Sequence, residues 1–515
     1  MKNCLKAIFK PAVASLFGVL LAISFAPFDI FPLAILAPAG LLFLLLGVSP
    51  KRAFWLGFSF GLGLFGAGVY WVYISVHTFG DVLPILAGLI TAALVGILAL
   101  FPATACYLSN RYFPVLDRTK NYFAFAACWV LIEWIRSWLF TGFPWLFVGY
   151  SQTNSPLKGF APIFSVYGVS LAALICSSLI VFAFLFYQQK NYRRVYINLF
   201  TIACIFTIGG LLSLIPWTTS AGKPIRVSLV QGNIPQSLKW SPDHLSLSFE
   251  RYQQLTETLW NKSQIIIWPE AAIPMTLQNA QSFINEMDKK ARENNTHLIL
   301  GIPIKNENGI GYYNAIVSVG SDLKVYLKRR LVPFGEYIPF EKYFSRAFSI
   351  LDIPLANMQA GKPFQAPLEI DGIKILPSIC YEIAFPELIR STDKNIGLLL
   401  TVTNDAWFGK STAQAQHLQM AAMRAIEMGR PVLFASNDGI TAVITPDGRI
   451  DTSAPAYEPT VLSTTVQPTK GLTPWMTNGI DPILFILLVI FVISVFEARA
   501  FKKQLSNVTV TQPIS

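Results

Sequence analysis

The sequence predicts a fold of two parts, an α-helical bundle of about eight transmembrane spans and an extracytoplasmic α/β domain. Of the 515 residues, 53% are hydrophobic and 13% are charged, which is about half the usual share of charge. The apolar residues also gather into long runs that are almost free of charge. Between the last two runs, the stretch 217–480 is polar and alternates short apolar strands with amphipathic helices.

Each apolar run is long enough, or nearly so, to cross a hydrocarbon core of about 30 Å as a helix. A retained first helix is favoured over a signal peptide, because the residues after the first apolar core make a poor cleavage site. We therefore expect a seven-span bundle at 1–216 and an eighth span with a cytoplasmic tail at 481–515. The predicted spans are Pro11–Phe28, Ile30–Pro50, Ala53–Val76, Val82–Asn110, Asn121–Phe140, Gly159–Gln189, Val195–Gly222 and Pro482–Phe496.

Basic residues mark one side of the predicted membrane. The short loops of the opposite side, around 77–81 and 141–158, hold a single cation, Lys158. By the positive-inside rule both termini are cytoplasmic and the polar domain lies outside the cytoplasm. The net charge of +11 thus reflects topology, and no nucleic-acid partner is expected. The cations of the inner side are Lys2, Lys6, Lys10, Lys51, Arg52, Arg111, Arg118, Lys120, Lys190, Arg193, Arg194, Arg499, Lys502 and Lys503.

The polar domain reads as a layered α/β structure, since strands and helices alternate first and hairpins follow. No metal or cofactor is expected, because the sequence has no P-loop, dinucleotide fingerprint or metal-spaced His/Cys cluster. The expected strands are Ile225–Gln231, Ile265–Trp268, His297–Ile304, Tyr313–Val319, Lys324–Leu327, Ile373–Ile379, Ile396–Thr403, Pro431–Ser436, Thr441–Thr445 and Val461–Thr465. The expected helices are Asp243–Trp260, Leu277–Asn294 and Thr412–Met428.

Three segments of this domain place reactive side chains at strand ends: Glu270, Lys328 and Cys380. Cys380 is the only cysteine of the polar stretch, so it has no disulfide partner there. A thiol, a carboxylate base and a fixed ammonium are a complete set for acyl transfer. The carboxylate takes the thiol proton, and the ammonium steadies the thiolate and then the oxyanion.

These three segments resemble the Glu-Lys-Cys pattern of the nitrilase superfamily, whose fold is an α-β-β-α sandwich. The whole chain is similar to the apolipoprotein N-acyltransferases, a membrane-embedded branch of that superfamily in Gram-negative bacteria. The motifs that carry the resemblance are Thr141-Gly-Phe-Pro-Trp145, Val230-Gln-Gly-Asn-Ile-Pro-Gln236, Trp268-Pro-Glu270, Leu331-Val-Pro-Phe-Gly-Glu-Tyr337, Cys380-Tyr-Glu382 and Thr403-Asn-Asp-Ala-Trp-Phe-Gly409.

The resemblance implies that Glu270 is the general base, Lys328 the stabiliser of thiolate and oxyanion, and Cys380 the nucleophile. It implies that Glu336 and Glu382 orient the lysine and complete the site, although either can be purely structural. Further positions that match the family near the substrate are Trp240, Tyr381 and Trp407, of which Tyr381 can offer its backbone N–H to the oxyanion and Trp240 can be ordinary packing. Asn404 and Asp405 are expected to shape their loop, and His77 and His417 receive no role.

The implied reaction moves a fatty acyl chain from a membrane phospholipid, through a Cys380 thioester, to the α-amine of an N-terminal diacylglyceryl-cysteine, the last step of bacterial lipoprotein maturation. The implied donor is phosphatidylethanolamine, and the implied enzyme is a cofactor-free monomer with ping-pong kinetics. It sits in the inner membrane with a periplasmic catalytic domain. The alternatives are a membrane-tethered amidase or nitrilase and a transporter with an inert domain.

Two features of the sequence lie outside the catalytic candidates, and their roles stay open. Glu133 and Arg136 lie three residues apart within a predicted span, where charges are costly and are usually paired or functional. They either clamp each other structurally or position a lipid. The apolar loop Phe344–Ile353 is expected to act as an arm that dips into lipid.

Overall fold

The computed structural model describes residues 2–113, 123–306, 311–337 and 358–509, with the backbone alone at 2–8 and 497–509. The expected lipid arm Phe344–Ile353 lies outside the described residues. The chain divides into two compact units. The helical unit comprises Met1–Tyr70, Gly88–Ile215 and Asn478–Ser515, and the sheet unit comprises Trp71–Ala87 and Pro216–Thr477.

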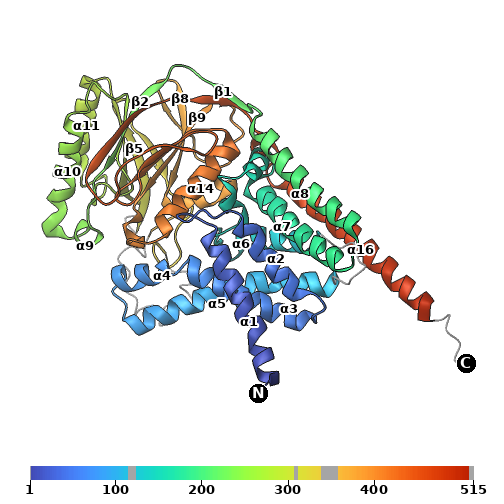
Figure 1. Ribbon diagram of the computed structural model, residues 1–515. Helices are drawn as coiled ribbons and strands as arrows, with labels where there is room; N and C mark the ends of the chain where they lie inside the picture. The colour runs from blue at the N-terminus through green and yellow to red at the C-terminus, as the bar shows by residue number, and fades with distance from the viewer. Residues whose placement is uncertain (1, 114–122, 307–310, 338–357, 510–515) are drawn as a thin grey trace, which may run out of the picture. The chain divides into compact units, whose positions relative to one another are not determined.

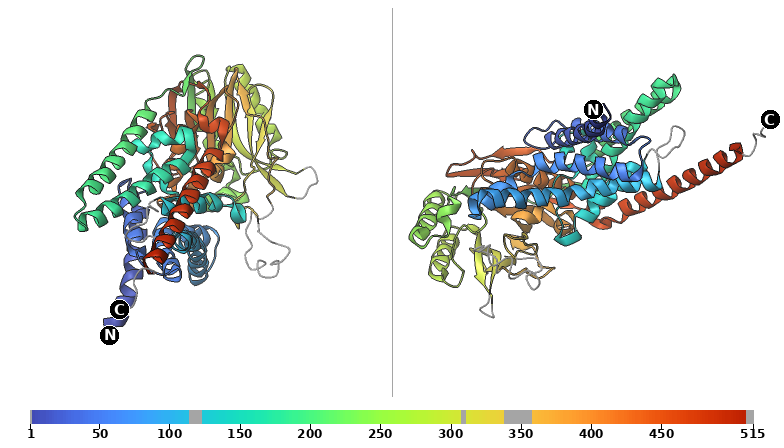
Figure 2. Two further views of the ribbon diagram at one scale, coloured as in Figure 1. Left: turned by 90° about the vertical axis from the view of Figure 1, so that its right-hand side faces the viewer. Right: turned by 90° about the horizontal axis from the view of Figure 1, so that it is seen from below.

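The helical unit consists mainly of long apolar helices. Helix α1 packs against α3 and α2, and α7 packs against α2 and α8; α7 and α8 run side by side in Figure 1. Both views of Figure 2 show α16 as one continuous helix that leads to the C-terminus. The helices are α1 (Lys2–Ile23), α2 (Leu33–Leu45), α3 (Pro50–Gly68), α5 (Pro84–Tyr112), α6 (Ala124–Arg136), α7 (Ala161–Gln188), α8 (Tyr192–Ser213) and α16 (Asp481–Thr509), with short 3-10 turns at Leu139–Thr141, Val148–Gln152 and Pro156–Phe160.

Three described helices are long and apolar enough to cross a membrane: Pro84–Tyr112, Pro156–Gln188 and Tyr192–Ser213. A fourth span results if the bent pair Pro50–Gly68 and Trp71–Phe79 is one broken helix. Shorter apolar helices cover Phe9–Ile23, Leu33–Leu45 and Asp481–Phe496. Several apolar helices in the N-terminal part are thus confirmed, and the count of eight spans stays a prediction.

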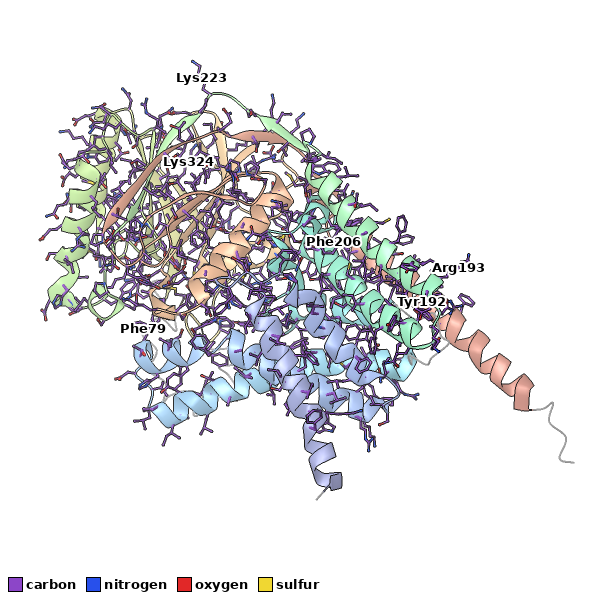
Figure 3. The ribbon with its side chains drawn as sticks, in the orientation of Figure 1. Phe79, Tyr192, Arg193, Phe206, Lys223 and Lys324 are labelled. Carbon is purple, nitrogen blue, oxygen red and sulfur yellow. The ribbon has the colours of Figure 1, made fainter. Side chains whose placement is uncertain are left out.

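The surface of α8 has the character of a lipid-facing helix. Only 11% of the most apolar 18-residue stretch of α8 is buried, and Phe200 and Leu211 are among its exposed side chains. Figure 3 shows Tyr192 and Arg193 at the first turn of α8 and Phe206 farther along it. An aromatic residue and a cation at the end of an apolar helix are typical of a membrane interface.

The two charges of α6 make separate contacts with the segment that follows the helix. Glu133 Oε1 accepts hydrogen bonds from the Val148 N–H at 2.8 Å and the Trp129 indole at 3.2 Å. Arg136 Nη1 donates to the Trp145 carbonyl at 2.8 Å. These contacts favour a structural role for both charges, because each fastens α6 to the next segment.

The sheet unit contains two six-stranded sheets and one two-stranded ribbon of β1 and β14. The first sheet has the order β12-β11-β10-β9-β8-β7 and the second the order β13-β2-β3-β4-β5-β6. Strands β8, β9 and β10 are parallel, as are β2, β3 and β4. The strands are β1 (Thr218–Ser220), β2 (Ile225–Gln231), β3 (Ile265–Ile267), β4 (His297–Lys305), β5 (Tyr312–Val319), β6 (Lys324–Leu327), β7 (Leu368–Ile370), β8 (Ile373–Ile379), β9 (Ile396–Thr403), β10 (Val432–Ser436), β11 (Ala442–Ile444), β12 (Ile450–Ser453), β13 (Thr460–Val466) and β14 (Thr469–Gly471).

Helices cover the outer faces of the two sheets. The helices α10 (Leu245–Glu257) and α11 (Gln281–Glu293) pack on the second sheet around a core that includes Trp268. The helix α14 (Ala413–Met428) packs on β10 and β11 of the first sheet, and Figure 1 shows the strands between these two sets of helices. This is the expected α-β-β-α arrangement. The shorter elements are α4 (Trp71–Ile74), α9 (Gln236–Lys239), α13 (Pro386–Ile389), α15 (Pro474–Asn478), a π-helical turn at Ser75–Phe79 and 3-10 turns at Pro242–His244, Cys380–Ala384 and Asp405–Phe408.

Candidate active site

Glu270 follows β3 at the carboxyl end of the parallel strands of its sheet. Its Oε1 accepts hydrogen bonds from Asn314 Nδ2 at 2.6 Å and Lys328 Nζ at 3.3 Å, and its Oε2 accepts from the Asn404 N–H at 2.8 Å. Its turn lies so close to Gly301 that a Cβ there would be 2.6 Å from Glu270 Cα. Burial would raise the pKa of Glu270, but the lysine charge and these hydrogen bonds outweigh it and hold the pKa below its usual range. The ionised carboxylate can accept a proton.

Lys328 lies between two carboxylates at the end of β6. Its side chain is 1% exposed, and Nζ is 2.8 Å from Glu336 Oε1 and 3.3 Å from Glu270 Oε1. Burial would lower the pKa of Lys328, but the Glu336 and Glu270 charges raise it well above the ordinary value. The ammonium is therefore a fixed positive charge in the site.

Glu336 is held by its own loop. Its Oε2 accepts from the Val332 N–H at 2.8 Å, while Asn314 Nδ2 donates to Oε1 at 3.2 Å. Its contact with Lys328 is the one expected of a residue that orients the lysine.

Cys380 begins a 3-10 turn directly after β8, with a φ of 51°. This left-handed conformation is unfavourable for a side chain with a Cβ and is often found at functional sites. Burial, and then the Glu270 charge, raise the pKa of the thiol well above its ordinary value, and the Lys328 charge opposes them only in part. Lys328 was expected to favour the thiolate, but burial and the Glu270 charge outweigh the lysine charge and raise the pKa of the Cys380 thiol.

The alkylation rate of Cys380 by iodoacetamide should therefore keep rising from about pH 7 to about pH 10, since only the thiolate reacts. Glu270→Gln removes a charge that raises the pKa of the thiol, so its profile should shift to lower pH. A Cys380→Ala background corrects for the other cysteines. A plateau below about pH 7 in the unsubstituted enzyme would contradict the neutral thiol.

Glu382 supports the site without a hydrogen bond to the lysine among the described contacts. Its Oε2 accepts from the Tyr326 hydroxyl at 2.9 Å and the Ile379 N–H at 2.8 Å, and its Oε1 accepts from the N–H groups of Arg329 at 2.6 Å and Arg330 at 3.1 Å. It joins the turn of Cys380 to the segment after Lys328 and so fixes their separation. These contacts favour the structural alternative for Glu382, and its orientation of Lys328 stays a prediction.

The aromatic candidates come from three turns of the sheet unit. Trp240 follows α9, and its buried indole N–H has no hydrogen-bond partner among the described residues. The Tyr381 ring packs edge-on against Phe385 at 4.9 Å. The carbonyl of Trp407 accepts from Ser75 Oγ at 2.7 Å, which ties the turn Asp405–Phe408 to the segment Trp71–Phe79.

Sequence reasoning did not predict the contacts that four polar residues make with the catalytic candidates. Asn314 bridges Glu270 and Glu336, and Asn404 binds Glu270 through its N–H. Lys239, fully buried, donates to the Glu270 carbonyl at 3.2 Å, and burial lowers its pKa to about 8. His417 contacts the Cys380 carbonyl. The Asn-Asp pair after β9 and the Lys before Trp240 were visible signals, whereas Asn314 and His417 had none. Within the described residues no group of His, Cys, Asp and Glu could hold a metal ion.

Comparisons with known proteins cover both units of the chain. The family model of the apolipoprotein N-acyltransferase N-terminal domain matches residues 17–179. The family model of carbon-nitrogen hydrolase matches residues 226–471. The apolipoprotein N-acyltransferase of Coxiella burnetii is 41% identical over 483 residues, which are 94% of this chain and 99% of that protein. The apolipoprotein N-acyltransferase of Azotobacter vinelandii is 39% identical over 466 residues, which are 89% of each chain.

Solved structures with a similar arrangement match about half of this chain. A carbon-nitrogen hydrolase superfamily protein from Xanthomonas campestris covers 48% of this chain and 91% of its own, with 21% identity and a TM-score of 0.37.

Proposed function

This chain belongs to the apolipoprotein N-acyltransferase family and N-acylates lipoproteins, and we propose that Cys380 carries the acyl chain from a membrane phospholipid to the lipoprotein as a thioester. The observation that supports this role most strongly is the placement of Lys328. Its buried ammonium lies 3.3 Å from Glu270 and 2.8 Å from Glu336, and its charge acts on the Cys380 thiol. A base, a cation and a nucleophile thus share one site.

In the first half-reaction the Cys380 thiol attacks the ester carbonyl of the phospholipid while Glu270 takes the thiol proton. Lys328 and the Tyr381 N–H stabilise the oxyanion. The C–O bond then breaks, and Glu270 returns the proton to the leaving alkoxide. The products are a thioester and a lysophospholipid. A neutral thiol beside an ionised carboxylate is the protonation state from which this step can begin.

In the second half-reaction the α-amine of the lipoprotein's N-terminal diacylglyceryl-cysteine attacks the thioester. Glu270 accepts a proton from the amine, the C–S bond breaks, and that proton restores the Cys380 thiol. The product is an amide. One site serves both steps in turn, so the kinetics should be ping-pong.

The proposed setting follows from the substrates and from the charge pattern of the loops. The donor is phosphatidylethanolamine, and the triad of the catalytic domain 217–480 faces the periplasm. The bundle 1–216 and the span in 481–515 hold the enzyme in the inner membrane as a monomer, with both termini in the cytoplasm. Trp240, Tyr381 and Trp407 lie near the acyl chains.

A two-stage assay separates acyl transfer from hydrolysis. The full-length enzyme is first incubated with acyl-labelled phosphatidylethanolamine, and the protein-bound label is measured. A synthetic diacylglyceryl-cysteine peptide with a free amine is then added. We expect the label to leave the enzyme as an amide of the peptide, while an N-acetylated control peptide takes none. Release of free fatty acid alone would favour the amidase-type alternative.

A further inference from the structure

A buried histidine and a buried aspartate lie behind the nucleophile. His417, on α14, and Asp405, at the start of the turn after β9, have side chains that are 0% exposed. His417 Nε2 lies 3.1 Å from the Cys380 carbonyl oxygen, and Nδ1 lies 3.0 Å from Asp405 Oδ1. Asp405 Oδ1 also accepts a hydrogen bond from Thr403 Oγ1 at 2.7 Å. The mechanism so far uses none of these contacts.

The acceptors around His417 determine how many protons the pair holds. A carbonyl oxygen only accepts, so Nε2 must carry a proton to bond to Cys380. An ionised Asp405 also only accepts, so Nδ1 must carry a second proton. A protonated Asp405 could instead donate from Oδ1 to Nδ1 of a neutral imidazole, but Oδ1 also accepts from Thr403 Oγ1, which favours the ionised carboxylate. With Asp405 ionised, both contacts require a doubly protonated imidazole. The pair is then neutral overall, as burial away from water requires.

The contact with the Cys380 carbonyl reaches the proposed oxyanion site through a single peptide unit. The carbonyl of Cys380 and the N–H of Tyr381 lie in one plane and point in opposite directions. A hydrogen-bond donor that fixes the direction of the Cys380 carbonyl therefore also fixes the direction of the Tyr381 N–H. The φ of Cys380, 51°, is a strained conformation that such a contact helps to maintain. A hydrogen bond from a cation also polarises the peptide, which makes its N–H a stronger donor.

We propose that His417 and Asp405 form a buried imidazolium–carboxylate pair that holds the Cys380–Tyr381 peptide and so aims the Tyr381 N–H at the oxyanion. Both are positioning residues, since neither contacts the reacting atoms. The inference rests on the proposed roles of Cys380 and Tyr381 in acyl transfer. Its proton count, however, can be measured without any substrate.

Nitrogen-15 NMR of the full-length enzyme, labelled at histidine, measures the proton count near neutral pH. The chain has four histidines, and the signals missing from His417→Gln assign those of His417. We expect both ring nitrogens of His417 to carry protons. A neutral tautomer in the unsubstituted enzyme would overturn the proposal, whatever the fate of the thioester mechanism.

Single-turnover acylation by labelled phosphatidylethanolamine tests the effect on the reaction. In Asp405→Asn, nearly the same shape remains but the carboxylate that holds the second proton is lost. We expect the maximal rate to fall roughly ten- to a hundredfold, as for a weakened oxyanion donor, with the half-saturating donor concentration changed less than about twofold. His417→Gln keeps an N–H donor toward Cys380 but leaves the Asp405 carboxylate without a cation beside it, so it should also be slow. The double variant has neither a buried charge nor a missing donor and should be faster than either single variant.

The matched control is His297→Gln. His297 forms the other His–Asp contact among the described residues, to Asp371 at 3.1 Å. It lies at the start of β4, away from the carboxyl strand ends that carry the catalytic candidates. It should acylate at the unsubstituted rate, and Cys380→Ala should not acylate at all.

Rates within about twofold for both single variants would overturn the proposal, as would a double variant slowed by the product of the two effects. Failure of Asp405→Asn to fold also counts against it, because a structural role would then suffice. If Cys380→Ala still acylates, the thioester mechanism is the part that fails.

Discussion

Cys380→Ala should lose acyl transfer by about 10⁴-fold or more, because no other group in the site can carry the acyl chain. No label from phosphatidylethanolamine should remain on the protein after denaturation. Folding should be little changed. The residue is 9% exposed, and its thiol adds little volume beyond a methyl group; alanine meets the same backbone strain as cysteine at a φ of 51°. Thermal unfolding and an acylation assay on the same sample measure both effects.

Cys204→Ala is the matched control, because it removes a free, half-buried thiol from the helical unit. It should transfer acyl chains at the unsubstituted rate. Cys380→Ser keeps the shape of the nucleophile and should still fail to form an acyl-enzyme, since a hydroxyl is harder to deprotonate than a thiol. Full transfer by Cys380→Ser would refute the thioester.

Much of the sheet unit could be predicted from the sequence, because its central strands are short, largely apolar and mostly buried runs. Strands β2, β6, β8 and β9 begin and end at the predicted residues. The strands that were missed are short and lie at sheet edges or in the two-stranded ribbon: β1, β7, β12 and β14. Pairing with a neighbour, rather than a buried apolar run, defines such strands, and the local sequence does not encode the neighbour.

The site was predictable to the extent that it lies at strand ends. Glu270, Lys328 and Cys380 each follow a strand, and the carboxyl ends of parallel strands are where polar groups converge. Asn314 lies within β5 instead. Its place beside Glu270 and Glu336 depends on the register of β5 and β6, in which the Lys328 N–H donates to its carbonyl at 2.8 Å. That register is a tertiary property, so the sequence alone offered no signal for it.

For a related reason the sequence did not indicate the direction of the pKa shift of Cys380, to which burial contributes most. A lysine near a thiol lowers the thiol's pKa when the lysine charge is available to it. In the structure Lys328 lies between two carboxylates, so the thiol meets the charge of Glu270 as well as that of the ammonium. Motif spacing identified the members of the cluster but not how its charges are shared.

Lys328→Met should lower acyl transfer by about 10³-fold, because the oxyanion loses its cation. It should also destabilise the sheet unit by about 3–5 kcal/mol, the usual cost of removing one partner from a buried ion pair. Glu270 and Glu336 would then face each other across Asn314 with no positive charge between them. Two adjacent buried carboxylates cannot both stay ionised, so one takes up a proton and the pKa of Glu270 rises. Initial rates and denaturant unfolding measure the two effects.

Lys324→Met is the matched control, since Lys324 lies on β6, the strand that Lys328 follows, is half-buried and donates to the Glu369 carbonyl; its side chain is labelled in Figure 3. It should behave as the unsubstituted enzyme in both measurements. Transfer by Lys328→Met within tenfold of that of the unsubstituted enzyme would remove Lys328 from the catalytic set.

The double variant Lys328→Met/Glu336→Gln separates the two roles of the lysine. Glu336→Gln removes one of the two facing negative charges and keeps an oxygen that can accept from the Val332 N–H. Much of the lost stability should return, because Glu270 is then the only charge left in the pocket of these three side chains and keeps its bonds to Asn314 and Asn404. Transfer should not return, since no ammonium faces the oxyanion. If activity recovered together with stability, Lys328 would hold the site together without stabilising the transition state.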